Sequence, residues 1–557
     1  MHPIHFSRKQ RFNAGFIAGL GAGVIATALM LLMSVTVGGI SLPEAFGSAF
    51  TEAIPSSVFD YLHRTIGGDA KHYLFYGILV GQCLVFALGG GICNLIVGSA
   101  KVGRGIDAQG RLSWQVGVTL ALVLWLLTGL IFLPLVGAGV FGAALTIGVV
   151  NSVLSLAVVG LAFGLLFVLI QNWLLTRRLH AQKPELKESF GEAEASDTRR
   201  TIVRNGLILL GLGTLGVLGW RFISSGGGSS GSTAVSVPAA GQGFQNKVAP
   251  PKPDYGAIQS VPHLSSEVTA NDQFYVVSKN LFQDPNVNGT TWKLTVDGLV
   301  ERPYTLTYND LQAMPMQKQY ETLECISNEV GGSYMSNAQW EGVQLAELLK
   351  RAGNVKPGAT KVVLYAADDY SDSIHLSKAL EPTTVVALRM NGQTLPPGHG
   401  YPARLLVPGI YGMKHVKWIT RIQVTNQDYQ GYWQTRGWSD PAPVRITSRI
   451  DTPVGNTNVT VNKPTYVAGV AFSGNQGISA VQVSFDSGRT WKQATLKQPL
   501  SALTWVLWEI PWTPTKSGSQ AIIVRAIDMA GNVQDPQVEP SAPNGSSGYH
   551  TINVTVA

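Results

Sequence analysis

The chain has 557 residues, of which 45% are hydrophobic and 13% charged, and its formal net charge is +7. A chain of this length has room for three or four domains. Much of the positive charge lies in loops beside apolar segments, where Lys and Arg report membrane topology, so the charge does not indicate a nucleic-acid-binding protein.

Five segments in the first 222 residues have the composition of membrane-spanning helices, each of which needs about 20 apolar residues. The predicted spans are residues 12–37, 73–99, 112–133, 141–175 and 205–222. The third and fourth lie in one uncharged run, which Pro134 and the glycines near residue 138 divide into two helices. The first four spans contain no Asp, Glu, His, Lys or Arg, which argues against a haem-bearing or proton-pumping membrane domain.

The loops predict an orientation. Basic residues cluster before the first span, between the second and third, and between the fourth and fifth, whereas the loop after the first span is mainly acidic. By the positive-inside rule the N-terminus lies in the cytoplasm and everything after Trp220 lies outside. The sequence therefore predicts a multi-pass protein of the cytoplasmic membrane, anchored in the lipid bilayer.

The fifth span permits two interpretations. Arg199 and Arg200 precede a short, glycine-rich apolar segment, as in a twin-arginine signal that exports folded proteins. The same pair could simply flank an ordinary helix on its cytoplasmic side. No small-residue cleavage site follows, so we expect the segment to remain as an anchor. Residues 223–254 then form a Gly/Ser-rich and Pro-rich linker.

Residues 255–443 mix strand and helix patterns without a regular βαβ series, which predicts an α+β domain. Strands are expected in TWKLTVDGLV, KVVLYAADD, ARLLVPGI and VKWITRIQVTN. Helical spacing connects Val343, Leu345, Leu348 and Leu349.

Residues 444–557 are almost entirely strand-like. Short alternating segments such as VQVSFD, AIIVRAID and HTINVTV are separated by regular turn signals, a pattern typical of an immunoglobulin-like sandwich. SFDSGRTW fits a sialidase Asp-box but occurs once, whereas a propeller needs repeats. We therefore expect it to form a hairpin with a tryptophan packed beneath it.

Cys325 is the only cysteine after residue 222. A lone cysteine in an exported domain is either an inert packed thiol or a functional thiolate. The segment TLECISNEVGGSYMSNAQWEGVQL around it resembles the metal-cysteine segment of the sulfite oxidase family. HGYPARLLVPGIYGMKHVKWITRI resembles the pterin-phosphate segment of that family, and FYVVSKN resembles its upstream cofactor loop. The resemblance covers residues 255–557 and does not include the membrane half.

This resemblance implies a molybdenum–molybdopterin cofactor, with Cys325 as metal ligand and catalytic position. It implies cofactor contacts at eight further positions: Tyr275, Val276, Asp368, His399, Arg404, His415, Val416 and Lys417. His415 and Val416 are expected to contribute backbone groups, and Asp369 is nearly as good a match as Asp368. The C-terminal domain is similar to the dimerisation domain of the family, which implies a homodimer.

The sequence departs from sulfite oxidases near the substrate. ISNEVGG follows Cys325 in place of a basic run, and the upstream loop offers Lys279 in place of arginine. Lysine lacks the bidentate guanidinium fork that suits a small dianion such as sulfite. Oxygen-atom transfer to or from a small-molecule substrate therefore stays open in both directions. Electrons are expected to go to a separate carrier or through another partner.

Three alternatives remain at the level of sequence. One is a repair reductase acting on oxidised methionine. Another is a non-catalytic membrane receptor or adhesion protein that has lost the cofactor. The third, in which the helices form a transporter and the outer half its sensor, is disfavoured by the uncharged spans.

Overall fold

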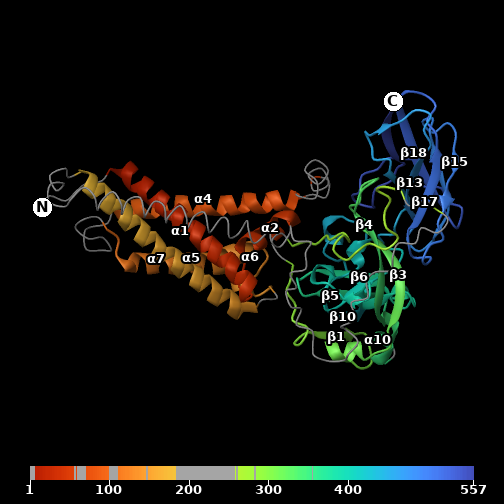
Figure 1. Ribbon diagram of the computed structural model, residues 1–557. Helices are drawn as coiled ribbons and strands as arrows, with labels where there is room; N and C mark the ends of the chain where they lie inside the picture. The colour runs from red at the N-terminus through yellow and green to blue at the C-terminus, as the bar shows by residue number, and fades with distance from the viewer. Residues whose placement is uncertain are drawn as a thin grey trace. The chain divides into compact units, whose positions relative to one another are not determined.

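The computed structural model describes residues 7–54, 58, 70–98, 111–145, 148–182, 258, 261–280, 284–353 and 355–557. The chain divides into two compact units, a helical N-terminal one and a larger C-terminal one (Figure 1). The predicted fifth span, the paired arginines and the whole predicted linker, residues 223–254, lie outside the described residues.

The first unit is a bundle of apolar helices: α1 (Arg8–Thr36), α2 (Leu42–Ala53), α4 (Ala70–Gly98), α5 (Trp114–Leu127) and α7 (Gly148–Gln182). A π-helical turn (Thr128–Phe132) and α6 (Leu133–Leu135) continue α5. Within the described residues, four helices are long and apolar enough to cross a membrane: Arg8–Thr36, Tyr73–Val97, Trp114–Leu135 and Gly148–Arg177.

Glycine lets these helices approach closely. A Cβ atom on Gly90 would lie 2.5 Å from the carbonyl oxygen of Gly15, which places the α1 and α4 backbones in contact. The break between the third and fourth predicted spans is longer than expected. It extends from Leu135 to Gly148 because Gly137, Gly139 and Gly142 adopt positive φ angles and hold a turn there.

The second unit begins with an α+β part built on two sheets. In the first sheet the strand order is β2 (Tyr304–Thr307), β1 (Lys293–Gly298), β10 (Ile419–Thr425), β5 (Lys361–Ala366) and β6 (Ser371–His375). In the second it is β3 (Gln317–Glu324), β4 (Met335–Gln344), β7 (Val385–Met390) and β8 (Gln393–Thr394), and β9 (Arg404–Leu406) pairs with β7. Strands from both sheets contribute to one hydrophobic core.

Short helices connect these strands: α9 (Tyr308–Gln312), α10 (Leu345–Arg351), α11 (Leu376–Ala379) and the 3-10 turns η4 (Pro397–His399), η5 (Gly412–Lys414) and η6 (Gln434–Arg436). Two details differ from the sequence patterns. Val343 lies on β4, because α10 begins only at Leu345. The strand predicted from Val416 begins at Ile419, because Trp418 takes a positive φ of 52°.

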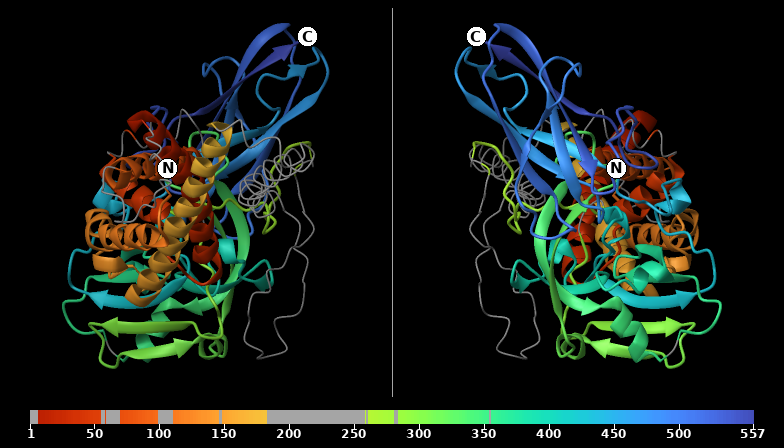
Figure 2. Two further views of the ribbon diagram at one scale, coloured as in Figure 1. Left: turned by 90° about the vertical axis from the view of Figure 1, so that its left-hand side faces the viewer. Right: turned by 90° about the vertical axis from the view of Figure 1, so that its right-hand side faces the viewer.

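The C-terminal part is a sandwich of two sheets (Figure 2). One sheet has the order β11 (Thr447–Thr452), β13 (Thr465–Phe472), β17 (Val506–Trp512) and β16 (Thr495–Leu496). The other has the order β12 (Asn458–Val459), β19 (His550–Val556), β18 (Gly518–Asp528), β14 (Ile478–Ser484) and β15 (Lys492–Gln493). Inward side chains of both sheets, among them Trp508 and Val481, share one core.

The Asp-box segment forms the hairpin between β14 and β15. Asp486 accepts hydrogen bonds from the hydroxyl and the backbone N–H of Thr490, at 2.6 and 2.8 Å, and these bonds lower the pKa of Asp486 to about 2. Trp491 packs edge-on against Tyr549, and Arg525 lies 4.1 Å above its ring. The segment forms a partly exposed turn between two strands of the sandwich.

Candidate active site

The Cys loop, Cys325–Tyr334, leaves the end of β3 and returns to β4. Its ends are joined by the Cys325 N–H, which donates to the Tyr334 carbonyl at 2.9 Å. The Asn328 side chain fixes the interior, because it donates to Glu324 Oε1 and accepts from the Tyr334 N–H, both at 2.9 Å. The loop thus holds Cys325 in a defined place beside the second sheet.

The Cys325 thiol is buried, with 8% of the residue exposed. Its sulfur lies 3.1 Å from the Ser327 hydroxyl. Burial raises the pKa of this thiol, an effect that the Ser327 bond opposes. The thiol is therefore protonated near pH 7 unless a ligand displaces the proton, as a soft metal ion does when it binds sulfur.

Arg404, the first residue of β9, is a buried cation. Its Nη1 donates to the His399 carbonyl at 3.1 Å and its Nη2 to the His415 carbonyl at 3.4 Å. Nε has no hydrogen-bond partner, and no carboxylate lies within ion-pair distance in the part of the chain that the structure describes. Burial lowers the pKa of Arg404 to about 10. A buried charge needs a partner, so this arrangement calls for an anionic ligand.

Lys417 lies beside Arg404. A Cβ atom on Gly400 would lie 3.0 Å from the Cβ atoms of both Arg404 and Lys417, so the glycine lets these two residues approach its backbone. The Lys417 ammonium donates to the Gly398 carbonyl at 3.1 Å and lies 4.1 Å from the centre of the Trp418 ring. The two cations together form a site that suits a phosphate group.

His399 closes the same turn as a neutral group. Its Nε2 lies 2.8 Å from the Asn271 carbonyl oxygen, and its ring packs edge-on against Phe274. Burial lowers the pKa of His399 to about 4, and the neighbouring charges of Arg404 and Lys417 act in the same direction. With Nε2 as the N–H donor to the carbonyl, Nδ1 is left as an acceptor.

The Tyr275 hydroxyl lies near the end of β3, next to Cys325 in the sequence. A Cβ atom on Gly412 would lie 2.7 Å from the Tyr275 hydroxyl and 3.2 Å from the Glu324 carbonyl oxygen. Burial raises the pKa of Tyr275 well above its usual value; Cys325 raises it further and Arg404 lowers it. The hydroxyl therefore stays protonated near pH 7.

The remaining predicted residues are less central. His415 is buried behind Arg404, and its Nε2 lies 3.0 Å from the Ile410 carbonyl oxygen. Val416 is a core residue whose carbonyl accepts from the Leu405 N–H at 2.8 Å. Val276 is half exposed on the loop after Tyr275. Asp368 lies in the turn between β5 and β6, where it accepts from the Tyr370 N–H at 3.2 Å.

The sequence prediction missed Glu321. This carboxyl group is buried on β3, and its Oε1 lies 3.9 Å from His415 Nδ1; neither atom has a hydrogen-bond partner in the described residues. Burial raises the pKa of Glu321 to about 8 and lowers that of His415 to about 3. The two groups are therefore a neutral pair near pH 7 despite their ion-pair distance. Only the inward position of an acidic residue on an alternating strand could have revealed it.

The described residues contain no group of three or more His, Cys, Asp and Glu that could hold a metal ion by themselves. The soft sulfur of Cys325 suits a metal ion, and the cations of Arg404 and Lys417 suit an anionic organic ligand. This combination of a thiol and two cations therefore fits a metal that is bound to an organic ligand with a phosphate group.

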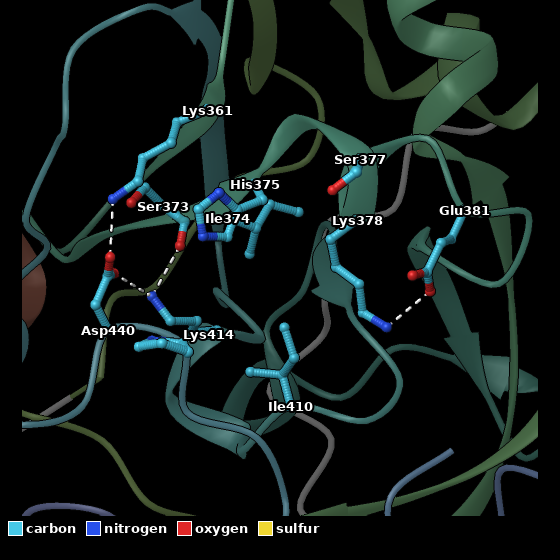
Figure 3. A pocket seen from close by; sticks show the side chains of 11 residues that line it. Lys361, Ser373, Ile374, His375, Ser377, Lys378, Glu381, Ile410, Lys414 and Asp440 are labelled. Atoms are coloured by element: carbon cyan, nitrogen blue, oxygen red, sulfur yellow. Dashed lines mark hydrogen bonds and ion pairs between the residues drawn. The ribbon is translucent and has the colours of Figure 1, made fainter. Parts of the chain in front are cut away.

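A separate cavity of about 220 Å³ lies by β6, α11 and η5 (Figure 3). Its lysines are paired: Lys361 and Lys414 point toward Asp440, and Lys378 points toward Glu381. Cys325 and Arg404 do not line it. Because its charges are compensated, we assign it no ligand.

Comparison with known proteins identifies the domains. A family model described as "Oxidoreductase molybdopterin binding domain" matches residues 282–433. A second, described as "Mo-co oxidoreductase dimerisation domain", matches residues 442–551.

Sulfite oxidase from Arabidopsis thaliana is 31% identical over 340 residues, which cover 50% of this chain and 84% of that protein. Mitochondrial sulfite oxidase from Rattus norvegicus is 31% identical over 328 residues, which cover 50% of this chain and 60% of that protein. The chain thus spans about 60% of the length of this mammalian relative. The solved sulfane dehydrogenase SoxCD from Paracoccus pantotrophus aligns over 55% of this chain and 90% of its own at 22% identity, with a TM-score of 0.45.

Proposed function

This chain belongs to the sulfite oxidase family, and we propose that it is a membrane-anchored oxidoreductase that transfers an oxygen atom to or from a small substrate outside the cytoplasm. The cofactor of this family, molybdenum–molybdopterin, fits the residues at the site. The observation that carries the proposal is a buried arginine with no carboxylate partner in the described residues, which lies beside Lys417. The Tyr275 hydroxyl lies near Glu324, the residue before the buried thiol of Cys325.

Each residue of the candidate site is assigned its own role in binding the cofactor. Cys325 would ligate the metal after losing its proton, and Arg404 and Lys417 would hold the pterin phosphate. His399 would bind the cofactor through its neutral ring, and Tyr275 would offer a hydroxyl that stays protonated. When bound, the cofactor supplies two-electron redox chemistry with oxygen-atom transfer. We also assign supporting contacts to Val276, Asp368, and the backbone of His415 and Val416.

The membrane assignment rests on four long apolar helices and on the basic loops beside them. With the N-terminus in the cytoplasm, four spans return the chain to the cytoplasm, and the fifth predicted span, residues 205–222, would then carry the C-terminal unit across the bilayer. Electrons would pass to or from a separate carrier. The C-terminal sandwich, for which we propose an immunoglobulin-like fold, would join two chains, in keeping with the description of its family model.

Sulfoxide reduction is a second candidate activity. Residues 326–332 contain no Lys or Arg, so a small dianion finds no guanidinium groups directly after Cys325. Assays of sulfite oxidation and of sulfoxide reduction with artificial electron carriers separate the two directions. We expect turnover in one of them with the wild-type protein and none with Cys325→Ser. Equal activity in that variant would contradict the role of the thiol.

A further inference from the structure

The Cys loop is held from outside as well as from within. Its internal bonds centre on Asn328, whose side chain joins the two ends of the loop. The carbonyl of the same residue accepts a hydrogen bond of 2.6 Å from the hydroxyl of Ser546, a residue of the C-terminal sandwich. The residue that shapes the loop is thus itself fixed by the neighbouring domain.

Two more sandwich residues contact the loop, from different strands. Arg449 on β11 donates from Nη1 to the Gly332 carbonyl at 2.8 Å. The ring of His550, at the start of β19, lies so close to Gly331 that a Cβ atom on that glycine would collide with it. Gly331 has a φ of 77°, so the imidazole closes over a turn that only glycine adopts easily.

The Arg449 and His550 side chains also make hydrogen bonds to residues outside the Cys loop. Arg449 is also bound by Asp451 at 2.6 Å and by the Ser265 hydroxyl at 2.8 Å. His550 Nδ1 accepts the Ile450 N–H at 2.9 Å. Burial, together with the charge of Arg449, lowers the pKa of His550, which favours the neutral ring that this acceptor role requires. These bonds restrain the Arg449 and His550 side chains in addition to their contacts with the loop.

The strand that leads into the loop is held in the same way. The Thr322 N–H donates to the Leu503 carbonyl at 3.0 Å, and the Thr322 hydroxyl accepts from the Trp505 N–H at 2.9 Å. The Ser501 hydroxyl donates to the Tyr320 carbonyl at 2.7 Å. Sandwich residues therefore contact both the entry to Cys325 and the loop that follows it.

We propose that Ser546, Arg449 and His550 are positioning residues that act on Cys325 through the Cys loop, so that the sandwich restrains the metal-binding thiol. The inference rests on the proposed function in one respect, the assignment of that thiol to the metal. It gives the C-terminal domain a role within each chain, independent of any pairing between chains. An interface that only stabilised the fold could contribute as much to the free energy of unfolding. It would not change how often the Cys loop opens locally and exposes the Cys325 thiol to solvent.

Thiol reactivity in the full-length chain tests this inference. The protein is made in cells that cannot synthesise the cofactor, treated with iodoacetamide, and analysed by peptide mass spectrometry, which distinguishes Cys325 from Cys83 and Cys93. We expect Ser546→Ala to raise the Cys325 alkylation rate about fivefold, the effect of losing one ordinary hydrogen bond on a local opening equilibrium. Arg449→Gln should raise it by at least as much.

Two variants serve as controls. Ser479→Ala removes a serine hydroxyl that donates to the Asp528 carbonyl at 2.6 Å inside the sandwich and does not contact the loop; its Cys325 rate should stay within about twofold of the wild-type rate. Ser546→Thr keeps a hydroxyl and should restore most of the protection. Wild-type rates in both Ser546→Ala and Arg449→Gln would overturn the inference, as would equal acceleration in Ser479→Ala. A wild-type protein that never binds molybdenum would end the proposed function but leave this measurement valid.

Discussion

Arg404 shows how a single buried residue specifies a ligand. It donates to two carbonyl groups, and among the described residues it has no carboxylate of the kind that a buried guanidinium ordinarily pairs with. Keeping such a charge in the protein costs stability unless an anion binds there. The free energy of unfolding and the affinity for the cofactor should therefore respond in opposite directions when the charge is removed.

The Arg404→Gln variant tests whether stability and cofactor affinity change in opposite directions. We expect the cofactor-free variant to be as stable as the wild type or more so, because a buried unpaired charge has been removed. Loss of charge-assisted hydrogen bonds should weaken cofactor binding by at least about tenfold. Pterin fluorescence after denaturation, measured per chain on purified protein, reports the retained cofactor.

Arg421→Gln is the matched control, because Arg421 pairs with Asp297 at 2.8 Å on the partly exposed side of β10. It should retain cofactor at the wild-type level. Full pterin content in Arg404→Gln would show that the guanidinium does not hold the cofactor.

The neutral pair of Glu321 and His415 predicts a pH dependence. The pKa of Glu321 rises from 4.5 to about 8 on folding, so its contribution to stability is complete below pH 4.5 and is lost as the pH rises toward 8. The pKa of His415 falls from 6.5 to about 3, so its contribution is complete above pH 6.5 and is lost toward pH 3. Above pH 7 the Glu321 effect should dominate this pair.

Between pH 7 and 8 the wild-type protein should therefore lose stability relative to Glu321→Gln, by up to about 1.4 kcal/mol per pH unit. Melting temperatures of the cofactor-free full-length chain in detergent, recorded at both pH values, measure this difference. Glu347→Gln, at a side chain that is 52% exposed, should follow the wild type. A Glu321→Gln curve parallel to the wild-type curve would mean that Glu321 is already ionised at pH 7.

At the scale of elements, the turn η5 is fixed by a buried ion pair. Lys414 ends this turn, and its ammonium contacts Asp372 on β6 at 2.8 Å, Asp440 at 3.1 Å and the Ser373 carbonyl at 2.8 Å. The Tyr370 hydroxyl donates to the Met413 carbonyl at 2.7 Å. These bonds fix the segment that continues into His415 and Lys417. β6 therefore helps to position the residues that we assign to the cofactor.

Lys414→Met should destabilise the protein by about 3–5 kcal/mol, because it leaves the Asp372 carboxylate buried without its cation. Adding Asp372→Asn should restore part of that loss, since the uncompensated charge is then gone. Thermal unfolding of the single and double variants measures both effects. Lys350→Met, at a side chain that is 77% exposed, should change stability by less than about 0.5 kcal/mol. An equally small effect at Lys414 would contradict the supporting role of the pair.

At the scale of the whole molecule, the proposed topology separates the site from the cytoplasm. Alkaline phosphatase, which is active only after export, should be active when fused after Ala557 and inactive when fused after Gln182, because the basic loop between the fourth and fifth spans is predicted to lie inside. The reverse pattern would place the oxidoreductase unit in the cytoplasm.

Sequence alone predicted much of this molecule because its strongest signals are local. Apolar runs gave the four long helices, and alternation gave strands such as β5, β14 and β18. The resemblance selected Cys325, Arg404 and Lys417, which the structure brings into one region of the second unit. The break between α6 and α7 was placed too short, because successive glycines with positive φ extend it.

The features that escaped prediction all depend on tertiary contacts. Glu321 and Lys414 are charged residues in an ordinary sequence context, and only packing shows that they are buried. The contact of Ser546 with Asn328 joins residues 218 positions apart. No repeating pattern in the sequence predicts a contact between residues so far apart.

The central claim is that the sulfur of Cys325 binds molybdenum. X-ray absorption at the molybdenum K-edge, recorded on cofactor-loaded wild-type protein and on Cys325→Ser, tests it most directly. We predict that the variant has one sulfur ligand fewer around the metal than the wild type. An unchanged sulfur count, or wild-type protein without molybdenum, would contradict the account.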